Sequence, residues 1–227
     1  SAYSPHEREM RRYGRPSIGS GLIFPINEEE LMCDPITIEE HWPRIAAIDF
    51  GWDHPTAVVW CAIDREEETF YIYDCHRASK ASPTVHSEVI RQRPYFIPIA
   101  YPHDGNRRDS MGNPGLAEQY RNLGCNFLLQ HFTNPPGLGE KKGSNSIEEG
   151  IMAMLQSMEN KNFKVFSTLH DWFEEFRMYH RKEGKVVPLR DDLMSATRYA
   201  FQSQRYAIAG SDPKWTSDLT YRNLGIV

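Results

Sequence analysis

Three hydrophobic segments separated by short polar turns constrain the fold of this chain most strongly. The first, RIAAIDFG from Arg44, is a nearly continuous apolar run, as expected for a strand that is buried on both faces. The segments Thr56–Asp64 and Thr69–Ala78 follow, and the acidic turn 65–68 separates them. Strand-like runs joined by short turns predict an antiparallel meander.

After this meander the hydrophobic period changes, and helices are expected to alternate with strands. Strands are predicted over 97–104, 125–132 and 163–166. Helices are predicted from Ser82-Pro83 to about residue 93, over 116–123, from the capping box Ser146/Glu149, over 169–182, and from about Asp191. This order predicts an α/β fold, in which helices flank a mixed sheet.

The periodic pattern is confined to residues 44–206, and this range sets the expected domain. Residues 1–43 contain turn-rich and acidic stretches without a sustained period, which is typical of a linker or an irregular arm. Residues 207–227 lose periodicity and are expected to form a C-terminal tail. A chain of 227 residues is long enough for one sizeable domain with such extensions.

The composition, with 40% hydrophobic and 25% charged residues, is that of an ordinary globular protein. No apolar run approaches the roughly 18 residues that a membrane span needs, so no membrane partner is expected. The four cysteines are scattered without a CxxC pair, which favours reduced thiols in a cytoplasmic protein over a disulfide framework or a zinc site.

The net charge of −5 argues mildly against a nucleic-acid partner but does not exclude one. Local basic patches can carry phosphate contacts, and a carboxylate-rich metal site lowers the total charge. Arg107 with Arg108, and Lys141 with Lys142, are candidate DNA-binding pairs. Each pair is equally well interpreted as solvated surface charge.

Acidic residues stand at the edges of three predicted elements. Asp49 ends the first strand, Asp104 ends the fourth, and Asp191 and Asp192 begin the final helix. If the first and fourth strands are neighbours, these carboxylates can meet at one edge of the sheet. Their repulsion would be relieved by a divalent cation that prefers oxygen ligands, such as Mg²⁺ or Mn²⁺. Ordinary turn and helix-capping roles are the alternative, and spacing alone leaves it open.

Three motifs resemble a known family. IDFGWDHPTAVVW (48–60), YPHDG (101–105) and LRDDLMSATRYAF (189–201) are similar to the nuclease domain of the terminase large subunit of tailed bacteriophages of the headful-packaging type. The resemblance extends over about residues 44–206, with a similar lead-in at SPHERE and GSGLIFP. It implies a ribonuclease H-like fold with a mixed sheet of five or more strands.

The resemblance also implies an activity and a site. It implies a two-metal endonuclease that cuts concatemeric double-stranded phage DNA during genome packaging, in the host cell cytoplasm. Asp49, Asp104 and Asp191 with Asp192 would bind two Mg²⁺ or Mn²⁺ ions. Which of the last two binds directly is open, because successive side chains on a helix diverge by about 100°. Asp53 and His103 are auxiliary candidates, although a loop role for Asp53 and a structural role for His103 are favoured.

Proteins of this family also carry an ATPase motor, and GLGEKKGS (137–144) does not fit the phosphate-loop pattern of such a motor. Residues 1–43 are therefore interpreted as the connection to a missing ATPase domain. That domain, the small subunit and the portal are the protein partners that the resemblance implies.

Three alternatives stay open. The first is an actin-like ATPase or a sugar kinase, whose first strand runs into a similar D-x-G-x-x-x-T pattern that Asp49, Gly51 and Thr56 nearly match. The second is a resolvase- or transposase-type nuclease of the same fold. The third is a catalytically silent docking module.

Overall fold

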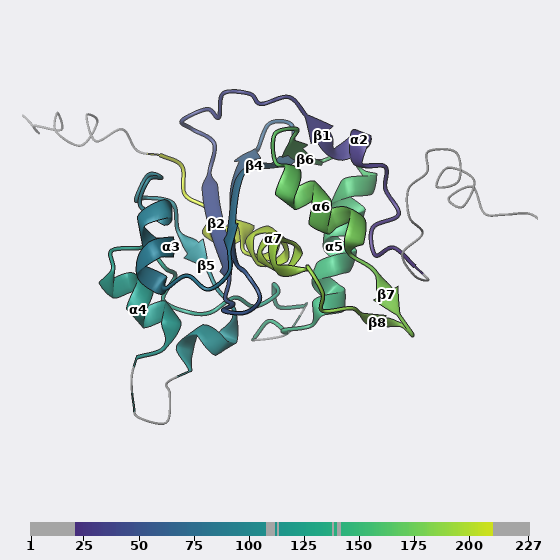
Figure 1. Cartoon of the computed structure of the whole chain (residues 1–227). Helices are drawn as coiled ribbons and strands as arrows, with labels where there is room; N and C mark the ends of the chain where they lie inside the picture. The colour runs from purple at the N-terminus through teal and green to yellow at the C-terminus, as the bar shows by residue number, and fades with distance from the viewer. Residues whose placement is uncertain (1–20, 108–111, 113, 138, 140–141, 211–227) are drawn as a thin grey trace, which may run out of the picture.

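A six-stranded mixed sheet with helices on both faces forms the centre of the fold (Figure 1). The computed structural model describes residues 21–107, 112, 114–137, 139 and 142–210. The strand order is β1-β6-β4-β3-β2-β5, and a separate two-stranded hairpin pairs β7 with β8. The predicted architecture, a mixed sheet of five or more strands flanked by helices, is confirmed.

The predicted meander makes up the middle of this sheet. β2 (Arg44–Asp49) pairs antiparallel with β3 (Thr56–Asp64), which in turn pairs antiparallel with β4 (Thr69–Ala78). β2 is buried on both faces, as its continuous apolar run predicts. Ile45 and Ala47 belong to the hydrophobic cluster on one face, and Ala46 and Ile48 belong to the cluster on the other.

The outer strands are short and parallel to their neighbours. β5 (Ile99–Ala100) lies beside β2, so the first and fourth predicted strands are neighbours. On the other side, β6 (Phe163–Phe166) pairs with β4, and β1 (Met32–Cys33) pairs with β6. The two strands whose ends carry candidate acidic residues therefore lie side by side.

The helices form a layer on each face of the sheet (Figure 1). One face is covered by α5 (Ile147–Glu159), α6 (His170–Met178) and α7 (Asp192–Gln202). The other face is covered by α3 (Pro83–Ile90) and α4 (Leu116–Asn122). α7 packs mainly against the neighbouring strands β2 and β3. The helix that begins with two aspartates thus crosses the sheet beside the strand that ends in Asp49.

Three predicted elements differ from the structure. The strand expected over 97–104 is only the two residues of β5, and the 3-10 helix η1 (His103–Asn106) follows it. The segment 125–132 is not a strand: because β5 is so short, it offers that segment a single bridge, between Ile99 and Phe127. The helix expected over 169–182 ends at Met178, and a hairpin follows.

This hairpin joins β7 (Arg181–Lys182) to β8 (Lys185–Val186). The two residues of its turn, Glu183 and Gly184, have φ of 52° and 77°. Positive φ at both central residues is the conformation that a two-residue hairpin requires, so the chain reverses here instead of continuing the helix.

The segment 21–43 is part of the folded unit and is not an arm outside it. It contains α2 (Glu28–Leu31) and the edge strand β1, and its side chains Ile23, Phe24 and Leu31 are buried in the core. At the other end, Ile208 bridges Arg44. The predictions for 1–20 and 211–227 lie outside the described residues.

All four cysteines are free. In the part of the chain that the structure describes, no helix has the length and apolar character of a membrane span.

Candidate metal centre

Asp49 is the residue on which the candidate site converges. It ends β2 on the same side of the strand as Ile45 and Ala47, which is the side that α7 covers. Burial, followed by the charges of Asp192, Asp104 and Asp191 in that order, raises the pKa of its carboxyl to about 8. The four acidic residues singled out by the sequence are therefore close enough to repel one another.

Hydrogen bonds between Gly51 and Thr56 close the loop that follows Asp49. The Thr56 hydroxyl accepts a hydrogen bond from the Gly51 N–H (3.1 Å) and donates one to the Gly51 carbonyl (2.8 Å). A Cβ on Gly51 would lie 2.3 Å from the carbonyl oxygen of His54, so only glycine fits there. These contacts fix the chain where it leaves β2 and explain the Gly and Thr of the first motif structurally.

Asp104 reaches the site from η1, directly after β5. Gly105 next to it has no room for a side chain, because a Cβ there would lie 2.6 Å from the ring of Phe50 and 2.8 Å from that of Tyr101. The glycine therefore lets η1 pack closely against Phe50, the residue that follows Asp49. Asp104 itself is exposed, so it stands at the open side of the site.

Asp191 and Asp192 stand at the start of α7. Asp191 occupies the N-cap position, yet its side chain makes no capping hydrogen bond, so helix capping does not explain it. Burial and the charge of Asp192 raise the pKa of Asp191, and burial raises the pKa of Asp192. The charge of His54, which follows Asp49 in the loop after β2, lowers both pKa values.

The donor set fits a hard divalent cation, although the carboxylates are not gathered around a common point. Within the described residues, no three or more His, Cys, Asp or Glu side chains stand as they would around a bound ion. The charges of Asp192, Asp104 and Asp191 nevertheless all raise the pKa of Asp49. Oxygen-only ligands of this kind suit Mg²⁺ or Mn²⁺.

Two residues of α7 that sequence reasoning missed complete the wall of the site. Arg198 is 5% exposed, its guanidinium lies 4.7 Å from the centre of the Tyr199 ring, and its charge lowers the pKa of Asp49. Tyr199 is hydrogen-bonded to Asp49, and burial followed by the Asp49 charge raises the pKa of the phenol. Both stand seven residues after the two aspartates of α7, a spacing that returns to the same helix face and was the available signal.

The two auxiliary candidates lie at the margin of the site. Asp53 is exposed in the loop after β2 and is not among the main influences on the pKa of the other aspartates. His103 is exposed in η1, with its ring centroid 6.3 Å from that of His131. The structure thus brings neither into contact with Asp49.

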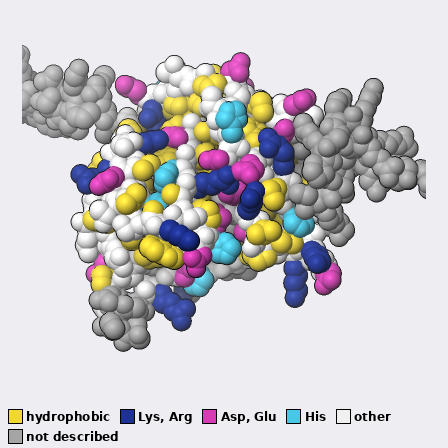
Figure 2. All heavy atoms as spheres, in the orientation of Figure 1, with side chains coloured by type: hydrophobic (Ala, Val, Ile, Leu, Met, Phe, Trp, Pro, Cys, Tyr) yellow, Lys and Arg dark blue, Asp and Glu magenta, His cyan; other side chains and the backbone are white. Residues whose placement is uncertain are grey.

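The candidate DNA-binding residues are only partly described. Arg107 is exposed three residues after Asp104, and Lys142 is exposed in the loop before α5. Arg108 and Lys141 lie outside the described residues. Figure 2 shows basic and acidic side chains interleaved near the centre of the visible face, without a continuous basic patch.

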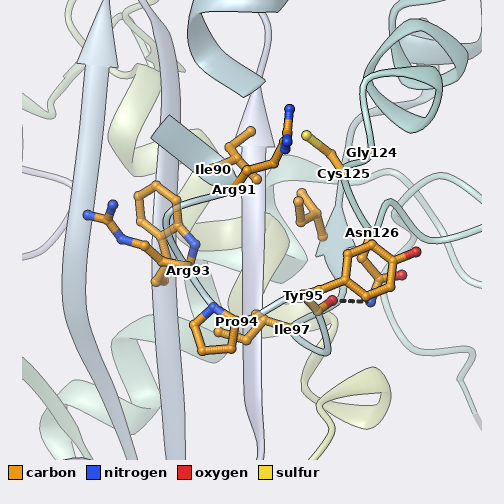
Figure 3. Close-up of a pocket in the computed structure, with 11 residues that line it drawn as sticks. Ile90, Arg91, Arg93, Pro94, Tyr95, Ile97, Gly124, Cys125 and Asn126 are labelled. Atoms are coloured by element: carbon orange, nitrogen blue, oxygen red, sulfur yellow. Dashed lines mark hydrogen bonds between the residues drawn. The ribbon is translucent and has the colours of Figure 1, made fainter. Parts of the chain in front are cut away.

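A separate pocket lies on the other face of the sheet, beside the end of α3 and the segment after α4 (Figure 3). Trp60, Arg93, Tyr95 and Cys125 are among its lining residues. At its mouth the amide of Asn126 donates a hydrogen bond to the Tyr95 carbonyl (3.0 Å). None of the four aspartates lines it, so it is distinct from the carboxylate site.

Comparison with known proteins identifies relatives of this arrangement. Residues 46–204 match the family model of the terminase RNaseH-like domain. The large terminase subunit of Salmonella phage P22 is 38% identical over 208 residues, which cover 91% of this chain and 40% of that protein. That of Enterobacteria phage LP7 is 39% identical over 202 residues, covering 88% of this chain and 41% of the relative. The chain spans about two fifths of the length of these relatives.

Solved structures agree with the sequence matches. The nuclease domain of the P22 large terminase superposes with a TM-score of 0.76 at 37% identity, covering 84% of this chain and 96% of that domain. The large terminase nuclease of the thermophilic phage G20c, solved with bound magnesium, has a TM-score of 0.55 at 15% identity. The match covers 81% of this chain and 98% of that nuclease. The second likeness shows the fold alone. The predicted ribonuclease H-like fold is confirmed.

Proposed function

The chain belongs to the terminase RNaseH-like domain family, and from this premise we propose that it is a metal-dependent endonuclease that cuts concatemeric double-stranded phage DNA during genome packaging. The observation that carries the proposal is the convergence on the half-buried Asp49, at the end of β2, of Asp104 from η1 and of Asp191 and Asp192 from the start of α7, whose charges all raise the pKa of Asp49. A nuclease of the same fold from phage G20c was solved with magnesium, which supports the choice of metal.

Asp49, Asp104 and the pair at the start of α7 are the residues that would hold two Mg²⁺ or Mn²⁺ ions. When bound, such a pair supplies the Lewis acidity for hydrolysing a phosphodiester bond. Asp49 is the shared ligand in this proposal, because the charges of the other three all act on it. Asp192 is its direct partner on α7, since its charge has the largest effect on Asp49 among the three.

The other residues of the wall orient Asp49. Tyr199 holds its carboxyl by a hydrogen bond, and Arg198 offsets part of the negative charge from the buried side. The exposed position of Asp104 leaves the opposite side open for the DNA backbone. With a net charge of −5 the chain is expected to bind DNA weakly, and more weakly as salt is added.

An ATPase motor, the small subunit and the portal would act together with this nuclease during packaging. We propose these partners, and the host cell cytoplasm as the place of action, by analogy with the relatives, of which the chain spans only about two fifths.

The rival interpretations lose their support at specific residues. Gly51 and Thr56, which match the actin-like pattern, are hydrogen-bonded to each other, and this contact explains both residues by the shape of the loop. A silent docking module does not account for a half-buried aspartate on which three like charges act. A resolvase or transposase shares the fold, and the family match favours the terminase nuclease instead.

Removing divalent metal is expected to stop cleavage completely. Nicking of supercoiled plasmid should occur in Mn²⁺ or Mg²⁺, cease in excess EDTA and return when Mn²⁺ is restored, because the carboxylates alone cannot activate a phosphodiester. Ca²⁺ at the same concentration serves as the ionic-strength control. Cleavage that persists in EDTA would rule out the proposed metal dependence.

A further inference from the structure

Glu175 on α6 is a buried carboxylate that the proposed chemistry does not use. Its side chain is 0% exposed. One carboxylate oxygen, Oε1, accepts a hydrogen bond from Arg77 Nη1 at 3.0 Å, and the other, Oε2, accepts one from the Leu193 backbone N–H at 2.6 Å. Because Arg77 and Leu193 engage both oxygens, Glu175 is not a free metal ligand.

The Leu193 amide belongs to the first turn of α7, where backbone N–H groups have no partner within the helix. The N-cap side chain normally satisfies one of these groups. Here the N-cap residue is Asp191, and its side chain makes no such bond. Glu175, from a neighbouring helix, accepts from the N–H of the second helical residue in its place. A capping role is thereby supplied from outside the helix.

Arg77 connects this cap to the sheet. It lies near the end of β4, is 20% exposed, and also pairs with Glu174 and with Asp171 (3.0 Å) on α6. Glu174 in turn pairs with Arg190, the residue before Asp191, at 2.8 Å. The start of α7 is therefore tied to α6 and to β4 by hydrogen bonds that do not involve either of its aspartates.

We propose that Glu175 is a positioning residue: held by Arg77, it caps α7 in place of Asp191 and so leaves Asp191 and Asp192 free to face Asp49. This inference rests on the proposed function, since it assigns the freed carboxylates to a metal. Outer residues that orient metal ligands typically change metal affinity by about ten- to a hundred-fold when they are removed.

The test compares three variants of the 227-residue chain. E175A removes both contacts of the carboxylate, whereas E175Q can keep the bond to the Leu193 amide but not the ion pair. D171N is the matched control. Asp171 lies on α6, as Glu175 does, and pairs with the same Arg77, but it does not cap α7. Mn²⁺ affinity is measured by electron paramagnetic resonance, and exchange of the Leu193 amide by NMR without metal.

E175A is expected to weaken Mn²⁺ binding by about ten-fold or more and to speed exchange of the Leu193 amide by about five-fold. The Mn²⁺ affinity and the amide exchange rate of E175Q should lie between those of E175A and D171N. D171N should match the unaltered chain in both quantities. If E175A does not fold, the difference between E175Q and D171N decides. Equal Mn²⁺ affinities in the Glu175 variants and D171N would overturn the proposal.

The two measurements separate this inference from the proposed function. An unaltered chain that binds no Mn²⁺ overturns the function, and the role assigned to the freed aspartates with it. Unchanged amide exchange in both Glu175 variants, in a chain that binds Mn²⁺, overturns the positioning role alone.

Discussion

Replacing Asp49 with asparagine is expected to abolish DNA cleavage while the chain stays folded. Asparagine keeps the shape of the side chain but removes the charge that the proposed site uses to hold its metals. We expect plasmid nicking in Mn²⁺ to fall at least about a thousand-fold, which corresponds to roughly 4 kcal/mol of transition-state stabilisation. The measurement is the initial rate of loss of supercoiled plasmid.

The same substitution should stabilise the metal-free chain. Because burial and three like charges raise the pKa of Asp49 to about 8, folding at neutral pH must either protonate this carboxyl or bury its charge, and the neutral asparagine avoids that cost. The midpoint of thermal unfolding should rise, by about 2–4 °C for each kcal/mol gained, and Mn²⁺ should no longer raise it.

D34N is the matched control for Asp49, since Asp34 is an exposed aspartate just after the edge strand β1. It should leave both cleavage and the response to Mn²⁺ unchanged. Undiminished cutting by D49N, with folding verified by circular dichroism, would refute the assignment of Asp49.

The two aspartates of α7 are expected to differ. The charge of Asp192 affects Asp49 more strongly than that of Asp191 does, and Asp192 is buried at 8% exposure. We therefore expect D192N to lower cleavage and Mn²⁺ affinity by about a hundred-fold or more, and D191N by only about ten-fold. Titration of Mn²⁺ into each purified variant measures the affinities.

Each of these two variants is the control for the other, because both remove one charge from the same turn of the same helix. A larger loss in D191N would exchange the roles of the two residues. Losses that are small in both would remove α7 from the metal site.

The meander and the main helices could be predicted because their signals are local. Each central strand is a hydrophobic run ended by a turn, and Ser146 caps α5 by accepting from the Glu149 N–H, as the capping box predicts. The neighbouring positions of β2 and β5 were only a condition at the level of sequence; the structure shows that the two strands pair in parallel.

Short elements escaped prediction because their lengths depend on tertiary partners. The segment 125–132 is apolar enough for a strand, but β5 offers it only one bridge. The strand β1 forms only because β6, more than 100 residues later in the chain, provides an edge beside it. Hydrophobic pattern alone does not encode such pairings.

The missed site residues show the same limit. Glu175 lies in an amphipathic helix and would be assigned to its solvated face, yet it is fully buried because Arg77, 98 residues earlier, pairs with it. Arg198 reads as a surface cation, and its burial follows from packing over the Tyr199 and Phe132 rings. Metal binding by the aspartates, which did stand out in the sequence, stays a prediction.

A crystal of the chain soaked in Mn²⁺ can decide whether the carboxylates form a metal centre. Anomalous difference maps locate manganese without reference to any assumed ligand. We expect two peaks about 4 Å apart, both beside Asp49, with Asp104 and Asp192 drawn in as ligands. A map with no peak at Asp49, from a crystal in which Mn²⁺ is bound elsewhere or not at all, would contradict the account.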